Sequence, residues 1–241
     1  MRPRVLLAGA TGLVGGMVLR MFYRRPACDA GLGFAPAETV AQPRVKHWVT
    51  IENDVEVIPV CRRPMPGYPG IVADFDDLPP LPEAQIAVCA LGTTRARAGS
   101  DAAFRAVDHD AVLTFARAAQ AAGVTHFILV SSVGANPNAR LLYPRTKGEV
   151  EAALAGMGFA RLDILQPGLL ICPKGYRRAE RRPVERVLQW AAPVMDPFLP
   201  RDVGSVPAEV VAQAIVALAA RTAPGVFRHA NRAIASIAAL A

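Results

Sequence analysis

The chain has 241 residues, 52% of them hydrophobic, and this length accommodates one α/β domain with a large buried core. Its net charge of +7 suits an anionic ligand or nucleic acid, but no aromatic residues are interleaved with the basic cluster at 177–182 or with Arg62 and Arg63, which disfavours nucleic acid. No uninterrupted apolar run reaches the roughly 18 residues of a membrane span.

Cysteine usage and the N-terminus bear on the compartment. No metal-ligand spacing links the four cysteines, which are Cys28, Cys61, Cys89 and Cys172. Arg2 and Arg4 before an apolar run imitate a signal peptide, but the glycine spacing and the arginines that follow argue against one. We therefore expect a reduced, cytoplasmic protein without a metal site.

The predicted elements begin with a buried strand at 5–8 and a helix at 13–23. Residues 26–54 have no sustained periodicity, and we interpret them as an insertion or a long loop. Strands are then predicted at 55–61, 70–74 and 86–91, although Pro59 indicates a bulge or a sheet edge in the first of these.

In the second half of the chain, predicted strands again alternate with predicted helices. Helices are predicted at 101–122 and 143–156, with strands at 125–131 and 159–165. A helix at 208–220 and a small terminal helix at 231–241 follow. Strands that alternate with helices predict an α/β fold, a Rossmann-type, doubly wound parallel sheet with helices on both faces.

We expect a single Rossmann domain over residues 1–241, with the insertion at about 26–54 and a small C-terminal cap at about 172–207. The cap contains an apolar patch at 187–199. Such a patch suits a homodimer contact, a protein partner or a lid over substrate.

Three glycines follow the first strand at the spacing Gly-x-x-Gly-x-x-Gly, namely Gly9, Gly12 and Gly15. A helix that begins there points unsatisfied N–H groups and the positive end of its dipole at the loop. Without side chains, the backbone can approach a pyrophosphate closely. The stretch therefore predicts a nucleotide phosphate cradle, with a plain glycine-rich turn as the alternative.

The end of the second strand indicates which dinucleotide fits. An NAD site offers a carboxylate to the ribose 2′-hydroxyl at this place. This chain offers Arg62 and Arg63, whose guanidinium groups suit a 2′-phosphate. We therefore predict NADP(H), and we expect Asp74 at the next strand end to contact the adenine.

Tyr143 and Lys147 lie four residues apart and share one face of a predicted helix. The unperturbed pKa of a tyrosine is about 10, and a nearby ammonium lowers it toward the range useful for acid–base catalysis. Ser131 and Ser132 end the preceding strand, and one of their hydroxyls could polarise a substrate carbonyl. A surface tyrosine and lysine at helical spacing are the alternative interpretation.

Together, the glycine spacing, the strand-end serine and the Tyr-x-x-x-Lys motif resemble the short-chain dehydrogenase/reductase family. Further stretches resemble the Tat-interacting-protein oxidoreductase branch of its atypical members: residues 89–95 (CALGTTR), 107–108 (VD), 126–132 (HFILVSS), 143–151 (YPRTKGEVE) and 166–170 (QPGLL). The resemblance covers most of the chain in order, while 26–54 and 173–204 match poorly.

This resemblance implies a Rossmann fold that binds NADP(H). Carried over by position, the pyrophosphate would be cradled by Gly9, Thr11, Gly12, Leu13 and Val14. The adenosine and ribose side would be lined by Leu91, Gly92 and Thr93. Tyr143 would donate or accept the proton, and Lys147 would bind the nicotinamide ribose. The nicotinamide would be covered by Pro167, Gly168 and Leu170.

The sequence departs from the family pattern at Asp108, which stands where many members have an asparagine that holds a proton-relay water. The choice between Ser131 and Ser132 stays open, with Ser132 preferred because it can turn toward the site. We predict an NADP(H)-binding oxidoreductase that acts on an unidentified carbonyl or alcohol. The alternatives are a non-catalytic or weakly catalytic NADP(H)-gated regulatory or binding protein and, third, a nucleic-acid binder that uses the arginines of 177–186.

Overall fold

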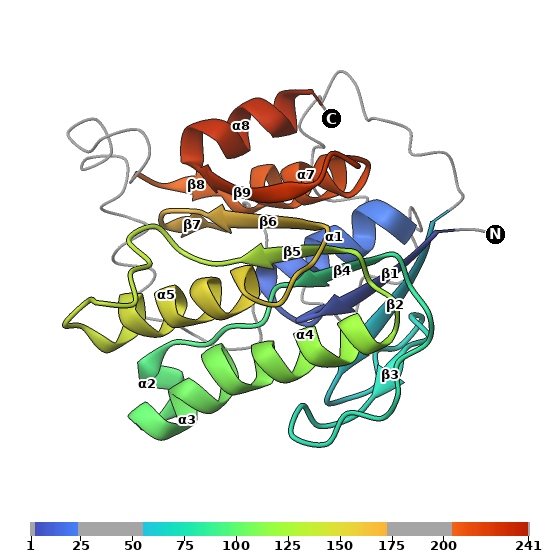
Figure 1. Cartoon of the computed structure of the whole chain (residues 1–241), viewed down its shortest axis with the longest axis horizontal. Helices are drawn as coiled ribbons and strands as arrows, with labels where there is room; N and C mark the ends of the chain where they lie inside the picture. Colours follow the sequence, from blue (N-terminus) through green and yellow to red (C-terminus); the bar gives the residue numbers. More distant parts are fainter. Residues whose placement is uncertain (1–2, 24–54, 173–203, 241) are drawn as a thin grey trace.

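A computed structural model describes residues 3–23, 55–172 and 204–240 of the chain (Figure 1). The expected insertion at 26–54 and most of the expected cap at 172–207 lie outside these residues. The same holds for the apolar patch at 187–199 and for the arginines of 177–186.

Seven parallel strands form one sheet in the order β3-β2-β1-β4-β5-β6-β9. The strands are β1 Arg4–Ala8, β2 Glu56–Cys61, β3 Ile71–Val72, β4 Ile86–Cys89, β5 His126–Val130, β6 Arg161–Gln166 and β9 Gly225–Ala230. From β1 the chain runs outward through β2 and β3, and it then returns to place β4 on the other side of β1. This order confirms the Rossmann-type fold and places the ligand crevice beyond the carboxyl ends of β1 and β4.

Helices cover both faces of the sheet, as predicted (Figure 1). They are α1 Leu13–Tyr23, α2 Arg95–Ala98, α3 Asp101–Arg105, the π-helical turn η2 Ala106–Asp110, α4 Ala111–Ala121, α5 Leu142–Ala155, α7 Ala208–Ala219 and α8 Asn231–Ala239. Helices α1, α7 and α8 lie on one face, whereas α4 and α5 lie on the other. A separate two-stranded parallel sheet pairs β7 Leu170–Ile171 with β8 Val206–Pro207.

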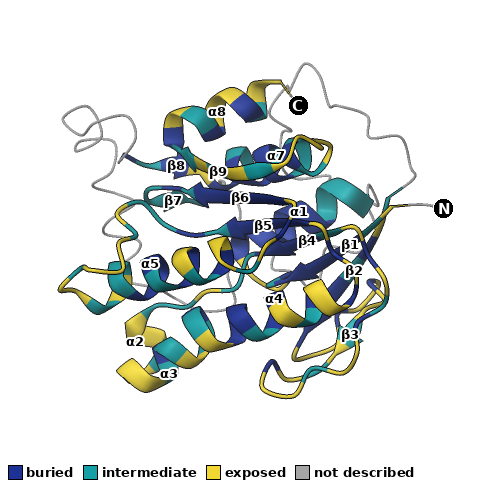
Figure 2. Cartoon of the chain, viewed as in Figure 1, coloured by how far each residue is buried: buried dark blue, intermediate teal, exposed yellow. Residues whose placement is uncertain are grey.

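Successive residues of a strand point to opposite faces of the sheet, so each face has its own hydrophobic core. Val5 and Leu7 pack with α1, α7 and α8, whereas Leu6 and Ala8 pack with α4 and α5. The central strands are therefore buried on both sides, as Figure 2 shows for β1, β4, β5 and β6. This explains why β1, β4 and β5 are nearly continuous apolar runs in the sequence, whereas β6 also carries the buried polar residues Arg161 and Asp163.

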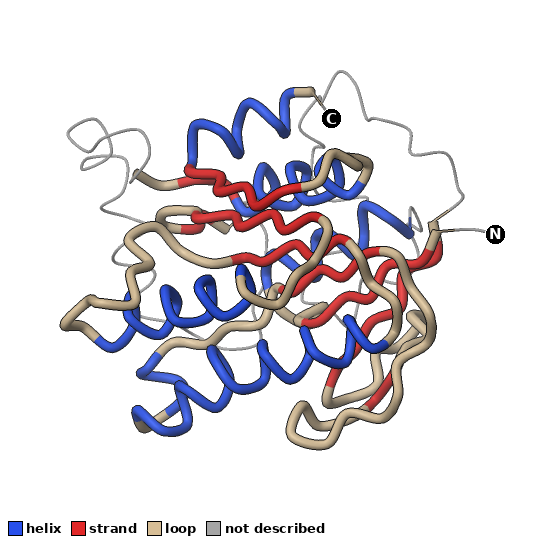
Figure 3. The backbone as a smooth tube through the Cα atoms, in the orientation of Figure 1, coloured by secondary structure: helices blue, strands red, loops and turns tan. Residues whose placement is uncertain are grey.

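Several features differ from the predicted elements; Figure 3 shows the observed strands in red and the observed helices in blue, in the orientation of Figure 1. Strand β9 and the short pair β7–β8 were not predicted, and in β9 Arg228 and His229 interrupt the apolar run. The helix predicted at 101–122 contains the π-helical turn η2. Strand β2 has neighbours on both sides, but β3 pairs only with Val60 and Cys61, so Pro59 precedes the paired part of that side and needs no bulge.

A buried carboxylate, Asp163 in β6, joins three basic side chains. Arg161 donates to both of its oxygens, at 2.6 and 2.9 Å. The Nε2 atoms of His126 and His229 lie 2.8 and 2.7 Å from its Oδ2 and Oδ1. Burial alone would raise the pKa of Asp163, but the hydrogen bonds from the histidines and Arg161 outweigh it and hold the pKa well below its ordinary value.

This cluster predicts acid lability. Because the pKa of Asp163 is lower in the folded chain than in the unfolded one, ionised Asp163 stabilises the fold above about pH 4, and this contribution is lost as the pH falls further. Urea unfolding at a series of pH values should show a weaker acid dependence in Asp163→Asn than in the wild type, and a lower stability at neutral pH. The exposed control Asp76→Asn should retain the wild-type dependence. Parallel pH curves for wild type and Asp163→Asn would contradict the assignment.

Candidate functional site

The glycine loop joins β1 to α1, and its glycines have different structural roles. Gly9 has φ +84°, and a Cβ there would lie 2.4 Å from the carbonyl oxygen of Ala90. A Cβ on Gly15 would lie 2.3 Å from the carbonyl oxygen of Gly9, so this glycine allows α1 to pack on the loop. Gly12 donates its N–H to Gly9 O at 2.9 Å and is exposed at the turn. Gly9 and Gly15 are thus tightly packed against neighbouring backbone, whereas the turn at Gly12 is open to solvent, which fits a pyrophosphate at the start of α1.

Three further residues of the predicted pyrophosphate site lie in or directly after the loop. Thr11 is exposed beside Gly12, whereas Leu13 and Val14 begin α1 and are buried in the core behind it. Only backbone groups of Leu13 and Val14 can therefore face a phosphate.

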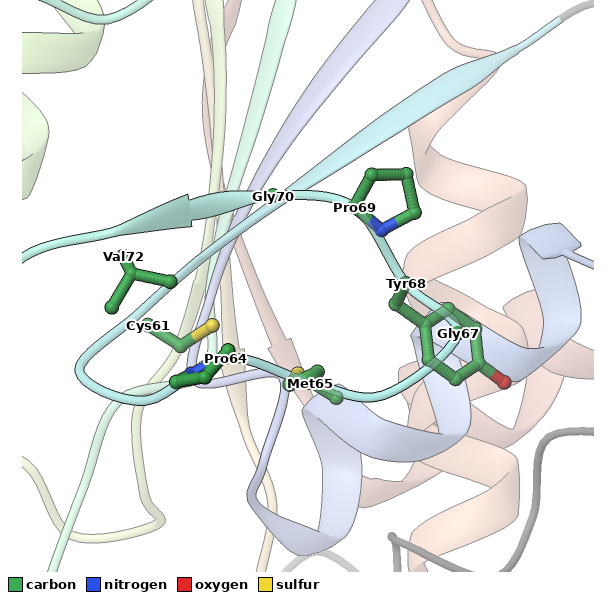
Figure 4. Close-up of a pocket in the computed structure, with 8 residues that line it drawn as sticks. All are labelled: Cys61, Pro64, Met65, Gly67, Tyr68, Pro69, Gly70 and Val72. Atoms are coloured by element: carbon green, nitrogen blue, oxygen red, sulfur yellow. The ribbon is translucent and has the colours of Figure 1, made fainter.

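The β2–β3 connection carries the predicted 2′-phosphate site. Arg62 and Arg63 directly follow β2 and are exposed, and Asp74 is exposed after β3. A pocket of about 440 Å³ lies within this connection, lined by Cys61, Pro64, Met65, Gly67, Tyr68, Pro69, Gly70 and Val72 (Figure 4). None of the predicted site residues lines this pocket, although Arg62 and Arg63 lie between two residues that do, Cys61 and Pro64.

The end of β4 meets the helical layer through Asp108, which is 1% exposed. The backbone N–H of Thr93 donates to Oδ2 of Asp108 at 2.7 Å. On the other side, Nζ of Lys147 lies 2.7 Å from Oδ1 of Asp108. Two donors therefore converge on one carboxylate, which the π-helical turn η2 holds in place.

This pairing sets the charge state of Lys147. Burial would lower the pKa of Lys147, but the carboxylate of Asp108, together with Tyr143, outweighs burial and raises the pKa. Lys147 is therefore a buried, protonated donor. A Cβ on Gly92 would lie 3.6 Å from Lys147 Nζ, so the ammonium lies at the strand end next to the glycine loop.

Tyr143 lies in the first turn of α5, one turn before Lys147. Its ring packs against the buried ring of Phe104, with centroids 5.8 Å apart. The side chain is 42% exposed. The structure thus gives Tyr143 a packed ring at an accessible position, as a group that meets substrate requires.

The two serines at the end of β5 have different surroundings. Ser131 is buried and donates to Oε1 of Glu151 at 2.6 Å. The same carboxylate accepts two bonds from Nε2 of Gln166 at 2.9 and 3.0 Å. Ser132 is half-buried, and its hydroxyl makes one longer contact, 3.3 Å, with the carbonyl of Val133. The hydroxyl of Ser132 can therefore turn to a ligand more easily than that of Ser131.

Gly148 holds the loop before α5 against the helix. A Cβ at Gly148 would lie 2.2 Å from the backbone nitrogen of Pro137. Asn136 donates its N–H to Pro144 O at 2.9 Å, next to Tyr143. Sequence reasoning missed this role of Gly148, because a glycine inside a helix does not reveal which backbone it contacts.

The turn after β6 contains Pro167 and Gly168 and leads to Leu170 in β7. Val133 donates its N–H to Pro167 O at 2.9 Å, so this turn is fastened to the serine loop. The predicted nicotinamide side of the site therefore lies beside Ser132, between the carboxyl ends of β5 and β6.

The described residues do not support a reactive cysteine, a metal site or a membrane-spanning helix. Burial raises the pKa of the Cys89 thiol to about 12, so it is not a reactive thiolate. Within 3–23, 55–172 and 204–240, no cluster of three or more His, Cys, Asp or Glu side chains could hold a metal ion. None of the helices in these ranges combines the length and the apolar character needed to cross a bilayer.

Sequence comparison finds relatives over most of the chain, although no family model matches. Protein fmp52 of Aspergillus fumigatus is 35% identical over 191 residues, which are 78% of this chain and 74% of that protein. Protein FMP52 of Lodderomyces elongisporus is 30% identical over 217 residues, 87% of each. Protein HTATIP2 of Rattus norvegicus is 43% identical over 118 residues, 47% of each.

These relatives correct the predicted location. The fungal proteins are named as mitochondrial, so the cytoplasmic prediction is wrong by this comparison. It rested on cysteine usage, which separates oxidising from reducing compartments and cannot separate one reducing compartment from another.

Solved structures share the fold at low sequence identity. UDP-N-acetylglucosamine 4-epimerase from Bacillus cereus has a TM-score of 0.62 at 14% identity, covering 97% of this chain and 82% of that one. Thermus thermophilus UDP-glucose 4-epimerase, in complex with NAD, has a TM-score of 0.58 at 16% identity, covering 98% and 82%. At these identities the likeness establishes the Rossmann-type fold.

Proposed function

The chain belongs to the family of the Fmp52 and HTATIP2 proteins, among the atypical short-chain dehydrogenases/reductases, and from this membership and the site geometry we propose that it is an NADP(H)-dependent oxidoreductase. The proposed substrates are a carbonyl compound in one direction and the corresponding alcohol in the other. Tyr143 is the proposed acid/base.

One observation carries the proposal, namely the continuity between the glycine loop and Lys147. Gly9 packs on Ala90 at the end of β4, and two residues later Gly92 faces the ammonium of Lys147. A ligand cradled on the loop would therefore extend along the end of β4 toward the face of α5 that bears Tyr143. This is the path that a dinucleotide needs between its pyrophosphate and its nicotinamide.

In the proposed reaction, the cofactor supplies the hydride and the protein supplies the proton and the hydrogen bonds. When bound, NADPH supplies a hydride to the carbonyl carbon. The Tyr143 hydroxyl donates its proton to the carbonyl oxygen, and the Ser132 hydroxyl donates a hydrogen bond to that oxygen. Lys147 holds the nicotinamide ribose with the donors that Asp108 leaves free.

Arg62 and Arg63 support a preference for NADP(H) over NAD(H). Removing charge-assisted hydrogen bonds costs about 1.5–3 kcal/mol each, or about 10- to 100-fold in affinity. Because two arginines are removed, we expect the variant Arg62→Ala/Arg63→Ala to lose about 10²- to 10⁴-fold in affinity for NADPH in calorimetry, with NADH binding unchanged. Arg117→Ala, an exposed arginine on α4, is the matched control. Equal wild-type dissociation constants for NADPH and NADH would contradict the preference.

A second function is favoured by the Asp108–Lys147 pair. A lysine neutralised by a buried carboxylate lowers the pKa of a neighbouring tyrosine less than a free lysine would. The alternative is therefore a weakly catalytic or non-catalytic protein in which NADP(H) occupancy controls a partner surface.

One paired experiment separates the two functions. NADPH oxidation is followed by absorbance with a panel of aldehydes, ketones and quinones, while pull-downs are run with and without NADPH. The oxidoreductase proposal predicts carbonyl-dependent NADPH oxidation. Consumption indistinguishable from the protein-free blank, together with NADPH-dependent capture of a partner, would favour the alternative.

A further inference from the structure

Asn231 connects the turn after β6 to the C-terminal helix. It is the first residue of α8 and is 5% exposed. Its Oδ1 accepts the backbone N–H of Gly168 at 2.9 Å. Its Nδ2 donates to the carbonyl oxygen of Gly204 at 2.7 Å. One buried amide thus joins two chain segments that are 36 residues apart in sequence, Gly168 and Gly204.

The chemistry of these contacts requires an amide. The Gly168 N–H needs an acceptor, whereas the Gly204 carbonyl needs a donor, and both partners are backbone groups that cannot reorient independently. Aspartate lacks the donor, and an apolar residue lacks both groups. The opposite demands of the two partners also fix the orientation of the Asn231 amide.

Neighbouring contacts hold two carbonyl groups of the turn. The Pro167 carbonyl accepts the N–H of Val133 on the serine side. The Leu169 carbonyl accepts the N–H of Val206, at 2.9 Å, on the β8 side. Pro167 has no N–H to satisfy. Asn231 therefore supplies the contact that fixes Gly168, the residue in the middle of the turn.

We propose that Asn231 is a positioning residue for the nicotinamide half of the cofactor site, acting through the backbone of Gly168; this rests on the proposed NADP(H) function. By accepting the Gly168 N–H, Asn231 fixes the position of the turn that would cover the nicotinamide ring. Helix α8, which lies on the opposite face from α5, thereby contributes to a site that it does not line.

The test compares two ligands on one variant. NADPH contains the nicotinamide, whereas adenosine 2′,5′-bisphosphate contains only the adenosine half. For Asn231→Ala we expect about a tenfold weaker binding of NADPH and an altered fluorescence of the bound reduced nicotinamide. Binding of the bisphosphate should stay within about twofold of wild type, which also shows that the variant is folded. Asn138→Ala, at an exposed asparagine, is the control.

Asn231→Leu provides a second variant, since it fills a similar volume without polar atoms and guards against a failure of the alanine variant to fold. A selective loss for NADPH supports the inference. Unchanged binding of both ligands, or an equal loss for both, overturns it, because a merely structural asparagine would not distinguish them. A wild-type protein that binds neither the bisphosphate nor NADPH would instead refute the proposed function.

Discussion

Replacing Tyr143 with phenylalanine is expected to reduce carbonyl-dependent NADPH oxidation by about 10²- to 10⁴-fold, the usual contribution of a positioned acid/base group. The variant keeps the ring that packs on Phe104 and removes only the hydroxyl. NADPH affinity should stay unchanged, because the phenylalanine keeps the ring beside the nicotinamide and none of the proposed cofactor contacts uses the Tyr143 hydroxyl. Steady-state rates and calorimetry on the same preparations measure both quantities.

The matched control is Tyr23→Phe, on the far end of α1. Tyr23 donates its hydroxyl to the carbonyl of Val57 at 2.9 Å, so the variant loses a hydrogen bond away from the site. We expect a small loss of stability in the control and a wild-type rate. If Tyr143→Phe turns over as fast as this control, Tyr143 is not the acid/base.

Breaking the buried pair of Asp108 and Lys147 is expected to have the largest effect on stability. The Thr93 N–H and the Lys147 ammonium face different oxygens of Asp108, and in Asp108→Asn an NH2 group replaces one of these two acceptors. One of the two donors is left unpaired in a site where Asp108 is 1% exposed. Loss of one partner of a buried ion pair costs about 3–5 kcal/mol, and we expect urea unfolding to show a loss of this order.

A double variant separates the pair from simple packing damage. Lys147→Met alone leaves Asp108 as an uncompensated buried charge, whereas Asp108→Asn/Lys147→Met removes both charges. The double variant should therefore be less destabilised than the sum of the single variants. Asp101→Asn, at the exposed pair with Arg95, is the control and should change stability by less than about 1 kcal/mol. Additive losses in the double variant would show that the two groups do not act as a pair.

The sheet was predictable because its strands are buried on both faces. Strands β1, β4 and β5 are apolar along most of their length, so even a short window indicates them. Strand β9 is an edge strand whose residues are half-buried or exposed. Because Arg228 and His229 interrupt its apolar residues, the sequence pattern did not predict it. The π-helical turn has no sequence signal, since a single inserted residue leaves the helical composition unchanged.

The site was predictable where it rests on local spacing. The glycine loop and the Tyr143–Lys147 pair are short motifs; the structure places the loop directly after β1 and Lys147 beside Gly92, just after β4, and their role in cofactor binding stays a prediction. Contacts between distant segments were not predictable in the same way. Asp108 stood out only as a departure from a family pattern, while the role of Asn231 depends on Gly168 and Gly204, which the sequence does not place beside it.

The structure of the NADPH complex tests the central proposal most directly. We predict that the pyrophosphate lies against Gly12 at the start of α1 and the 2′-phosphate between Arg62 and Arg63. The nicotinamide should lie between Tyr143 and the turn at Gly168, with its ribose on Lys147. A dinucleotide bound elsewhere, or one whose nicotinamide points away from Tyr143, would contradict the proposal.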